Sequence, residues 1–343
     1  MNNAKKKIDV ATFLNGEISM PYFDEVFADQ ARDRQKALTK PQKSLGKLED
    51  IAIWMAGWQR KSFPTVKNAH CLVFAGNHGI AQKGVSAYPS EVTSQMVENF
   101  YAGGAAINQL CNLADMALSV IPIDLENPTR DFSESLAMDK EETLSAMQIG
   151  FESVPSDCDL LVLGEMGIGN TSAATAIACV LFNQSVDTWT GAGSGLSTKG
   201  VESKISIIKS AHKLHGKNFE RVEDILSSFS GREMAAIAGA VIAARIYSIP
   251  VLLDGFISTT SAATLTLYSK TILDHCLISH LSTEPGHAGI LSFLGKEPLL
   301  DLNMRLGEGS GAAVASLIIR AALATHNGMA TFSEAGVSGI KKE

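Results

Sequence analysis

The segment RLGEGSGAA (residues 305–313) places one carboxylate, Glu308, inside a glycine-rich turn that precedes a predicted helix over 311–325. Glycine-rich turns that open a helix commonly bind phosphate, because bare backbone N–H groups and the helix dipole attract anions. A carboxylate would repel a phosphate bound at the same point. Glu308 is therefore either a solvated turn residue or a general base that points into a cleft, and Ser310 is the expected N-cap of the helix.

The turn GEMGIGNTS (164–172) is a second candidate for anion binding. It follows a buried apolar run that ends at Leu163, and a helix is expected from about Thr171, with Asn170, Thr171 or the next serine as its N-cap. The turn matches neither the G-x-G-x-x-G nor the Walker A pattern, so a nucleotide-cofactor motif is not supported. It is either an ordinary strand-to-helix turn or a phosphate site in which Glu165 accepts hydrogen bonds from ribose hydroxyls.

The stretch TGAGSGLSTKGVESK (190–204) repeats this pattern and adds a cation. Its glycines, Gly193 among them, precede a helix in which Lys204 could neutralise a phosphate or a carboxylate. The commoner place for such a lysine is an exposed helix face. Tyr88 and Met96, at and after a tyrosine–proline turn, could wall a flat aromatic ligand or serve as ordinary core and surface residues.

The other reactive side chains form no recognisable metal or nucleophile motif. His275, His280 and His287 are spaced by five and seven residues, whereas ligand pairs on a helix are commonly three or four residues apart. The five cysteines are scattered without a C-x-x-C pair, which indicates buried thiols in a reducing cytoplasm. Neither GSG sequence is a G-x-S-x-G elbow. We expect structural or substrate-adjacent histidines, and no metal.

The composition excludes several classes of function. The chain has 343 residues, 45% of them hydrophobic, which is enough for one large or two smaller domains. A net charge of −7 without a basic stripe argues against a nucleic-acid partner. The longest uncharged runs, such as MAAIAGAVIAA (234–244), are too short to span a membrane, and no signal peptide is recognisable. We expect a cytoplasmic protein with small-molecule ligands.

Short apolar runs alternate with alanine-rich helical stretches along most of the chain. Such alternation is typical of an α/β fold whose parallel sheet carries helices on both faces and binds ligands beyond the carboxyl ends of its strands. Polar, glycine-bearing loops follow several runs (AGNHGI, GEMGIGNTS and DGFIS), and we expect them to share one site. The expected strands are 70–76, 117–125, 158–165, 249–256 and 275–282, and the expected helices are 23–38, 46–59, 171–182, 201–215, 232–246 and 311–325.

Seven segments together resemble one family, the nicotinate-nucleotide–dimethylbenzimidazole phosphoribosyltransferases, over about residues 40–335. They are KPQKSLGKLE (40–49), HGIAQKGVSAYPSEVT (78–93), GEMGIGNTS (164–172), GAGSGL with Lys204 (191–204), VLLDGFIS (251–258), SHLSTEPGH (279–287) and PLLDLNMRLGEGSGAA (298–313). The resemblance implies transfer of the phosphoribosyl group of nicotinate mononucleotide to 5,6-dimethylbenzimidazole, giving α-ribazole 5′-phosphate and nicotinate with inversion at the anomeric carbon. The leaving group is cationic and needs no protonation, so no metal or cofactor is implied.

The same resemblance, taken residue by residue, implies roles within the site. Glu308 is similar to the family's general base, which takes the N–H proton of the benzimidazole. Glu165 is similar to the ribose-side carboxylate. The phosphate side falls at Gly167, Asn170, Thr171 and Gly193, with Lys204 close by and Ser282 near the mononucleotide. The benzimidazole pocket falls at Tyr88, Met96, Met166 and Leu306.

For the fold, the resemblance implies a doubly wound α/β architecture with a mostly parallel sheet. A large domain over 65–310 would bind nucleotide and base, and a small helical domain would combine 1–64 with 311–343. Family members resemble one another in being homodimers, with the small domain of one chain near the partner's site.

Three positions depart from the family's pattern. Lys43 stands where glycine is common, Asn77 where many members have aspartate, and Arg232 within a usual double glycine. Two other functions stay open: the same scaffold with another azole or phenolic acceptor, and a non-catalytic nucleotide-binding sensor. Retention of Glu308 and Glu165 argues against the sensor, because a pure binder gains nothing from a carboxylate beside the reacting centre.

Overall fold

A sheet of six parallel strands forms the centre of the computed structural model, which describes residues 8–339. The strand order is β2-β1-β3-β4-β5-β6, so the chain winds outward from β1 in both directions, as the doubly wound architecture requires. Every neighbouring pair is parallel. The strands are β1 (Ala69–Ala75), β2 (Ala117–Pro122), β3 (Leu160–Met166), β4 (Val251–Leu253), β5 (Cys276–His280) and β6 (Pro298–Leu300).

All of the predicted strands are present, because a strand buried on both faces forms a continuous apolar run. Residues 160–165 of β3, for example, are all buried. Three predictions are too long: β2 ends at Pro122, β4 is confined to Val251–Leu253 and β5 to Cys276–His280. Strand β6 was not predicted, since three half-buried residues that begin with proline give no such run.

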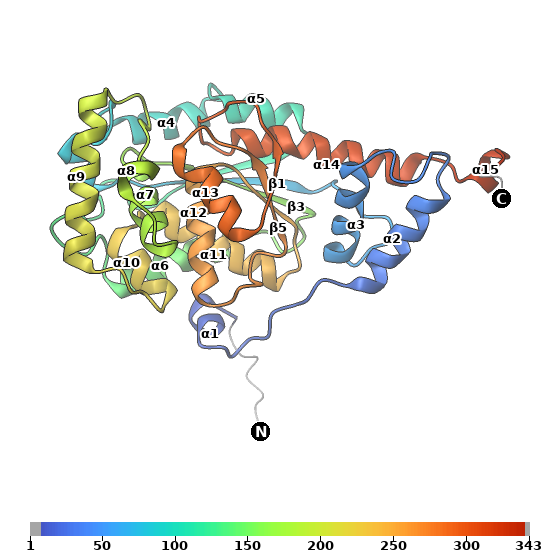
Figure 1. The fold of residues 1–343 in the computed structure, drawn as a ribbon, viewed down its shortest axis with the longest axis horizontal. Coiled ribbons are helices and arrows are strands. Elements are labelled where there is room, and N and C mark those ends of the chain that lie inside the picture. Colours follow the sequence, from blue (N-terminus) through green and yellow to red (C-terminus); the bar gives the residue numbers. More distant parts are fainter. Residues whose placement is uncertain (1–7, 340–343) are drawn as a thin grey trace.

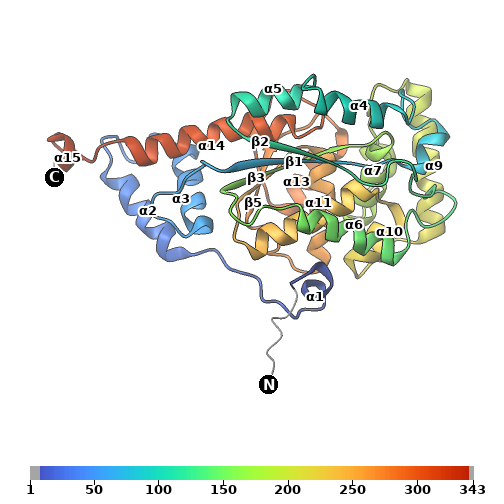
Figure 2. The ribbon, with the colours of Figure 1, turned by 180° about the vertical axis from the view of Figure 1, so that it is seen from behind.

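Helices cover both faces of the sheet, as Figures 1 and 2 show. They are α1 (Val10–Leu14), α2 (Glu25–Ala37), α3 (Lys47–Gln59), α4 (Val92–Tyr101), α5 (Ala106–Leu113), α6 (Lys140–Glu152), α7 (Asn170–Leu181), α8 (Val186–Trp189), α9 (Thr198–His215), α10 (Val222–Phe229), α11 (Arg232–Ile246), α12 (Phe256–Ala263), α13 (Pro285–Leu294), α14 (Ser310–Gly328) and α15 (Phe332–Ala335), with short 3-10 turns η1 (Gly79–Lys83) and η2 (Thr264–Leu267). Among residues 8–339, none of these helices is long and apolar enough to cross a membrane.

The two faces of the sheet build two cores, because successive side chains of a strand point to opposite sides. Leu161 and Leu163 join the core that contains α6, α7 and α11. Val162, between them, joins the core that contains α3, α5 and α14. The fold class predicted from the sequence is thus confirmed.

The predicted N-caps of two helices are wrong. Helix α14 begins at Ser310 itself, after Gly309 at a φ of 84°, and the buried Ser310 hydroxyl has no hydrogen-bond partner within residues 8–339. Helix α7 begins at Asn170, after Gly169 at a φ of 101°. Glycine adopts this left-handed conformation without strain, and neither helix has a polar side chain as its cap. Both helices therefore begin with N–H groups that no N-cap side chain satisfies.

Helices from the two ends of the chain pack together. Helix α3 contacts α2 and α14, and α14 runs from the sheet toward α2 and α3 (Figure 1). Helix α1 instead packs on α6 and α11. The division into a large domain (65–310) and a small one (1–64 with 311–343) stays a prediction, and residues 1–7 and 340–343 of the small domain lie outside the described residues.

Lys43 has a left-handed backbone with a φ of 59°. This conformation explains why glycine is common at this position in the family that the chain resembles. This conformation costs a non-glycine residue about 1–2 kcal/mol, whereas glycine loses about 0.5–1 kcal/mol of chain entropy on folding. We expect Lys43→Gly to raise the free energy of unfolding by about 0.5–1 kcal/mol, measured by urea denaturation. Lys43→Ala removes the same side chain without relieving the strain, so an equal gain in both variants would contradict this explanation.

Candidate active site

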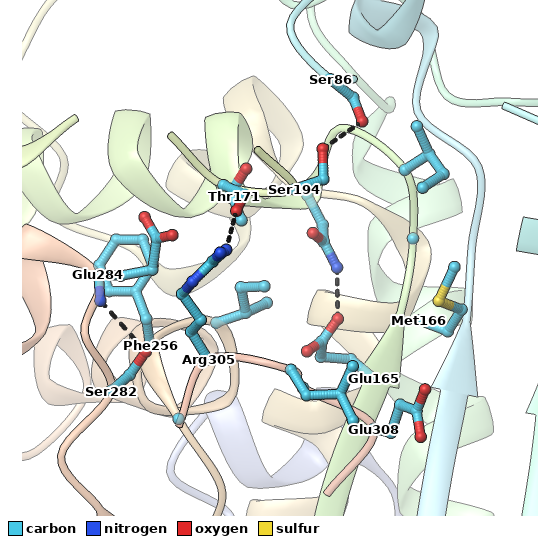
Figure 3. A pocket seen from close by; sticks show the side chains of 18 of the residues that line it. Ser86, Glu165, Met166, Thr171, Ser194, Phe256, Ser282, Glu284, Arg305 and Glu308 are labelled. Atoms are coloured by element: carbon cyan, nitrogen blue, oxygen red, sulfur yellow. Dashed lines mark hydrogen bonds between the residues drawn. The ribbon is translucent and has the colours of Figure 1, made fainter. Parts of the chain in front are cut away.

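A cavity of about 490 Å³ opens at the carboxyl ends of β3, β4 and β5 (Figure 3). Its wall combines the loops after these strands with parts of segment 86–96 and the turn before α14. The sequence-predicted residues that line it are Tyr88, Met96, Glu165, Met166, Gly167, Asn170, Thr171, Gly193, Ser282, Leu306 and Glu308. Lys204 lies behind this wall, where its Nζ is 2.9 Å from Oγ1 of Thr171.

Glu308 is the middle one of three consecutive left-handed residues. Gly307, Glu308 and Gly309 have φ values of 89°, 62° and 84°. A glutamate is strained in this conformation, and such strain persists where the surrounding structure holds the residue in place. The Glu308 N–H donates to the carbonyl of Glu165 at 3.2 Å, and its Oε2 accepts from the N–H of Ile107 at 3.4 Å. Glu308 is only 6% exposed, so it is not a solvated turn residue.

Asp254, directly after β4, holds the start of α14. Its Oδ2 accepts from the N–H of Gly309 at 3.2 Å, and its Oδ1 accepts from the N–H of Ala312 at 2.9 Å. The same Oδ1 is 3.6 Å from Nε2 of His280. Asp254 thus accepts hydrogen bonds from the start of α14 as an N-cap side chain would, although it follows a strand of the sheet, and it fixes the turn that carries Glu308.

The carboxyl groups of Glu165 and Glu308 are less acidic than in water. Burial raises the pKa of Glu165 to about 8, and repulsion from Asp254 and Glu233 adds to the effect, against a hydrogen bond from Asn170. Burial also raises the pKa of Glu308, against the hydrogen bond from the N–H of α5. A raised pKa makes the carboxylate of Glu308 a stronger base than that of a solvent-exposed glutamate.

The pKa of Glu165 predicts a loss of stability with rising pH. The folded chain keeps this proton to about pH 8, whereas the unfolded chain releases it near pH 4.5, so the folded state is disfavoured progressively between these values. One proton accounts for at most about 1.4 kcal/mol per pH unit. We expect Glu165→Gln to make urea-derived stability fall less steeply from pH 5 to pH 8. The exposed Glu126, changed to glutamine, is the control; equal slopes in both variants would contradict the assignment.

The other end of the cavity has two cations, Lys204 and Arg305, together with one carboxylate, Glu284. The Nζ of Lys204 donates to Thr171 and, at 3.4 Å, to the carbonyl of Gly191; burial lowers the pKa of Lys204 to about 8. The guanidinium of Arg305 donates to the carbonyl of Gly193 at 2.8 Å. The first turn of α7, which lines the cavity with Asn170 and Thr171, adds the positive end of the helix dipole. Figure 3 shows Thr171 on the side of the cavity away from Glu308. Lys204 is therefore not an exposed helix residue.

Several polar and aromatic lining residues were not predicted, namely Ser86, Asp254, Phe256, Glu284 and Arg305. Asp254 and Phe256 stand in the DGFIS loop, and Arg305 begins the RLGEGSG motif, so a fuller use of these two motifs would have found them. The hydroxyl of Ser86 lies 2.8 Å from that of Ser194 and joins two loops of the wall. No sequence signal marks that contact.

The three histidines are buried side chains, and His275 precedes β5, at the end of that strand opposite the cavity. His280 lines the cavity, and Nδ1 of His287 accepts from the N–H of Ser282 at 2.9 Å. Burial lowers the pKa of His275 and of His287 to about 3, so both are neutral at neutral pH. In the part of the chain that the structure describes, no group of three or more His, Cys, Asp or Glu could hold a metal ion.

The departures at Asn77 and Arg232 lie outside the cavity lining. The Asn77 amide donates to the carbonyl of Leu125 at 3.0 Å. The guanidinium of Arg232 donates to the carbonyl of Asn127 and lies 3.5 Å from the carboxylate of Glu142. Both side chains therefore hold the loop after β2 against the neighbouring segments.

Comparison with known proteins shows the family to which the chain belongs. A family model described as "Phosphoribosyltransferase" matches residues 20–337. A nicotinate-nucleotide–dimethylbenzimidazole phosphoribosyltransferase of Cereibacter sphaeroides is 49% identical over 94% of this chain and 95% of its own length. The protein of the same name from Mesorhizobium japonicum is 49% identical over 94% of this chain and 96% of its own length.

The likeness extends to three dimensions. A crystal structure of the enzyme of that name from Thermus thermophilus has a TM-score of 0.86 at 36% identity and covers 92% of this chain and 99% of its own. The match thus covers nearly all of both chains. The chain belongs to the family of nicotinate-nucleotide–dimethylbenzimidazole phosphoribosyltransferases.

Proposed function

We propose that this enzyme transfers the phosphoribosyl group of nicotinate mononucleotide to 5,6-dimethylbenzimidazole, with Glu308 as general base and with inversion at the anomeric carbon. The observation that carries the proposal is the polarity of the cavity. A buried carboxylate with a raised pKa stands on one wall, and cations with an uncapped helix start stand at the other end. A donor phosphate at the cationic end leaves Glu308 free for the acceptor.

The reaction needs one proton acceptor. A ring nitrogen of dimethylbenzimidazole forms a bond to the anomeric carbon, and the bond from that carbon to the pyridinium nitrogen breaks. The bonding electron pair stays with the pyridine, which leaves as nicotinate without protonation. The attacking ring becomes cationic, so its other N–H becomes acidic, and Glu308 takes this proton. Attack from the face opposite the leaving group gives the α-product.

The other lining residues position the two substrates. Gly167, Asn170, Thr171 and Gly193 bind the phosphate through backbone and hydroxyl groups, with Lys204 supplying charge through Thr171 and Ser282 contacting the mononucleotide. Glu165 accepts hydrogen bonds from the ribose, and its hydrogen bond from Asn170 connects the ribose and phosphate sides. Tyr88, Met96, Met166 and Leu306 wall the benzimidazole.

The openness of the acceptor wall supports a second candidate, transfer to another azole or phenol. Tyr88 is 53% exposed and Leu306 is 58% exposed, so this wall can accommodate rings of different outline. Glu308 serves any acidic N–H or O–H. Competition between dimethylbenzimidazole and unsubstituted benzimidazole or phenol, with one donor, separates the two candidates.

The direct test incubates the purified protein with nicotinate mononucleotide and dimethylbenzimidazole, without added metal, and separates the products by chromatography. We expect α-ribazole 5′-phosphate and nicotinate in equal amounts. If the mononucleotide binds but no nicotinate appears with any azole or phenol offered, transfer is refuted and the sensor function replaces it.

We extend the proposal to a cytoplasmic homodimer. The resemblance to dimeric family members supports the assembly, and the five buried free cysteines suit a reducing compartment. Light scattering after size exclusion should give twice the mass of one chain, and the mass of one chain would contradict the dimer.

A further inference from the structure

A buried pair, His78 and Glu233, lies beside the cavity without lining it. The two side chains are 1% and 0% exposed, and Nε2 of His78 is 2.7 Å from Oε1 of Glu233. His78 follows β1, whereas Glu233 stands in the first turn of α11, so the pair joins two distant segments of the chain. The proposed mechanism uses neither residue.

The pair supports the turn between β3 and α7. A Cβ added at Gly167 would lie 2.7 Å from the carbonyl oxygen of Gly76, 3.2 Å from Nε2 of His78 and 3.3 Å from Oε1 of Glu233, so the turn lies against the pair and against the backbone of the loop that carries His78. A Cβ at Gly169 would lie 3.3 Å from Cβ of His78. Gly167 and Gly169 belong to the cavity wall, and every atom of this support comes from outside that wall.

The support is itself held in place. The N–H of Gly76 donates to the carbonyl of Met166 at 3.0 Å, which ties the loop of His78 to the end of β3. Arg232, adjacent to Glu233, donates to the carbonyl of Asn127. The carboxylate also lies at the start of α11, where the helix dipole favours negative charge. The pair is thus fixed relative to the strands that form the cavity.

Stability alone does not explain a buried polar pair at this position. Apolar residues of similar volume would stabilise the fold about as well, because desolvation offsets most of the attraction between buried partners. The polar pair instead provides a directional contact of fixed length beneath the turn between β3 and α7. That turn carries the N–H groups to which the proposed function assigns the donor phosphate.

We propose that His78 and Glu233 are positioning residues that hold the turn from Gly167 to Asn170 in its phosphate-binding conformation. This inference rests on the proposed function. Disrupting the pair should weaken binding of the donor, and only of a donor that carries the 5′-phosphate. Once the donor is bound, transfer at the anomeric carbon, which lies on the other side of Glu165 from the phosphate, should proceed at nearly the wild-type rate.

The test compares two donors, nicotinate mononucleotide and nicotinate riboside, which lacks the phosphate. We expect Glu233→Gln to raise KM for the mononucleotide about tenfold, with kcat within about threefold and KM for the riboside unchanged. His78→Gln changes the other partner of the pair and should give the same pattern. Glu223→Gln is the matched control, because Glu223 is also a buried, paired glutamate in the first turn of a helix, α10, outside the cavity lining.

Three outcomes would overturn the inference: equal losses with both donors, an unchanged KM for the mononucleotide, or the same pattern in Glu223→Gln. Calorimetric binding of the two donors without acceptor gives a readout that does not need turnover. If the wild type binds the mononucleotide but transfers nothing, the proposed reaction fails. A phosphate-dependent loss of affinity in Glu233→Gln would still support the positioning role.

Discussion

Replacing Glu308 by glutamine is expected to lower kcat by about 10²–10⁴-fold. Glutamine keeps the volume of the side chain, and its oxygen can still accept the N–H of Ile107, which lies 3.4 Å from the carboxylate. The turn should therefore keep its shape. The amide cannot take the proton from the attacking ring, so the loss falls on the chemical step. Steady-state kinetics with both substrates varied measure it directly.

The accompanying observations separate lost chemistry from lost structure. Donor binding, measured by calorimetry, should stay within about twofold of the wild type, because Glu308 does not contact the phosphate in the proposed mechanism. Glu297→Gln, at an exposed ion pair with Lys47, should keep the wild-type rate. A kcat for Glu308→Gln within threefold of the wild type would show that another group takes the proton.

Gly164→Ala is expected to lower kcat by at least about 10²-fold through a single methyl group. A Cβ at residue 164 would lie 2.4 Å from the nitrogen of Gly309 and 2.5 Å from the carbonyl carbon of Glu308. All of these are backbone atoms, so the turn must move away from β3. A shift of about 1 Å at Glu308, the proposed general base, is enough for a loss of this size.

A second alanine serves as the control for this substitution. Gly328, the last residue of α14, has no heavy atom within 4 Å of an added Cβ, so Gly328→Ala should leave kcat unchanged. Circular dichroism should show that both variants are folded at the assay temperature. Wild-type kcat in Gly164→Ala would mean that the position of the turn does not limit the reaction.

The sequence was sufficient to predict the elements that bury apolar residues continuously. The long strands β1 and β3 and helices such as α11 follow directly from local pattern. The starts of α7 and α14 do not, because a glycine precedes each helix and, for α14, Asp254 from another strand satisfies N–H groups of its first turn. Strand β6 has only three half-buried residues and begins with proline, so it leaves no apolar run to detect.

The cavity could be predicted only in part, for a related reason. Gly-rich turns and the residues inside recognisable motifs, such as Glu165 and Glu308, can be identified from local sequence. Side chains that matter through contacts across the chain cannot. His78 and Glu233 are 155 positions apart, and nothing in either local segment indicates the other. The burial of Lys204 could not be predicted either, because its position on α9 is typical of many exposed lysines.

Because of the left-handed turn at residues 307–309, the residue type at position 308 should show whether a homologue has remained under selection for the reaction. Glycine or asparagine would fit a φ of 62° with less strain than glutamate does. In a descendant released from selection for transfer, drift should therefore replace Glu308 by one of these residues and retain the flanking glycines. A homologue that keeps the fold but has glycine or asparagine at this position would be more stable and would have lost the proposed reaction. Its amino-acid sequence alone would be enough to recognise it.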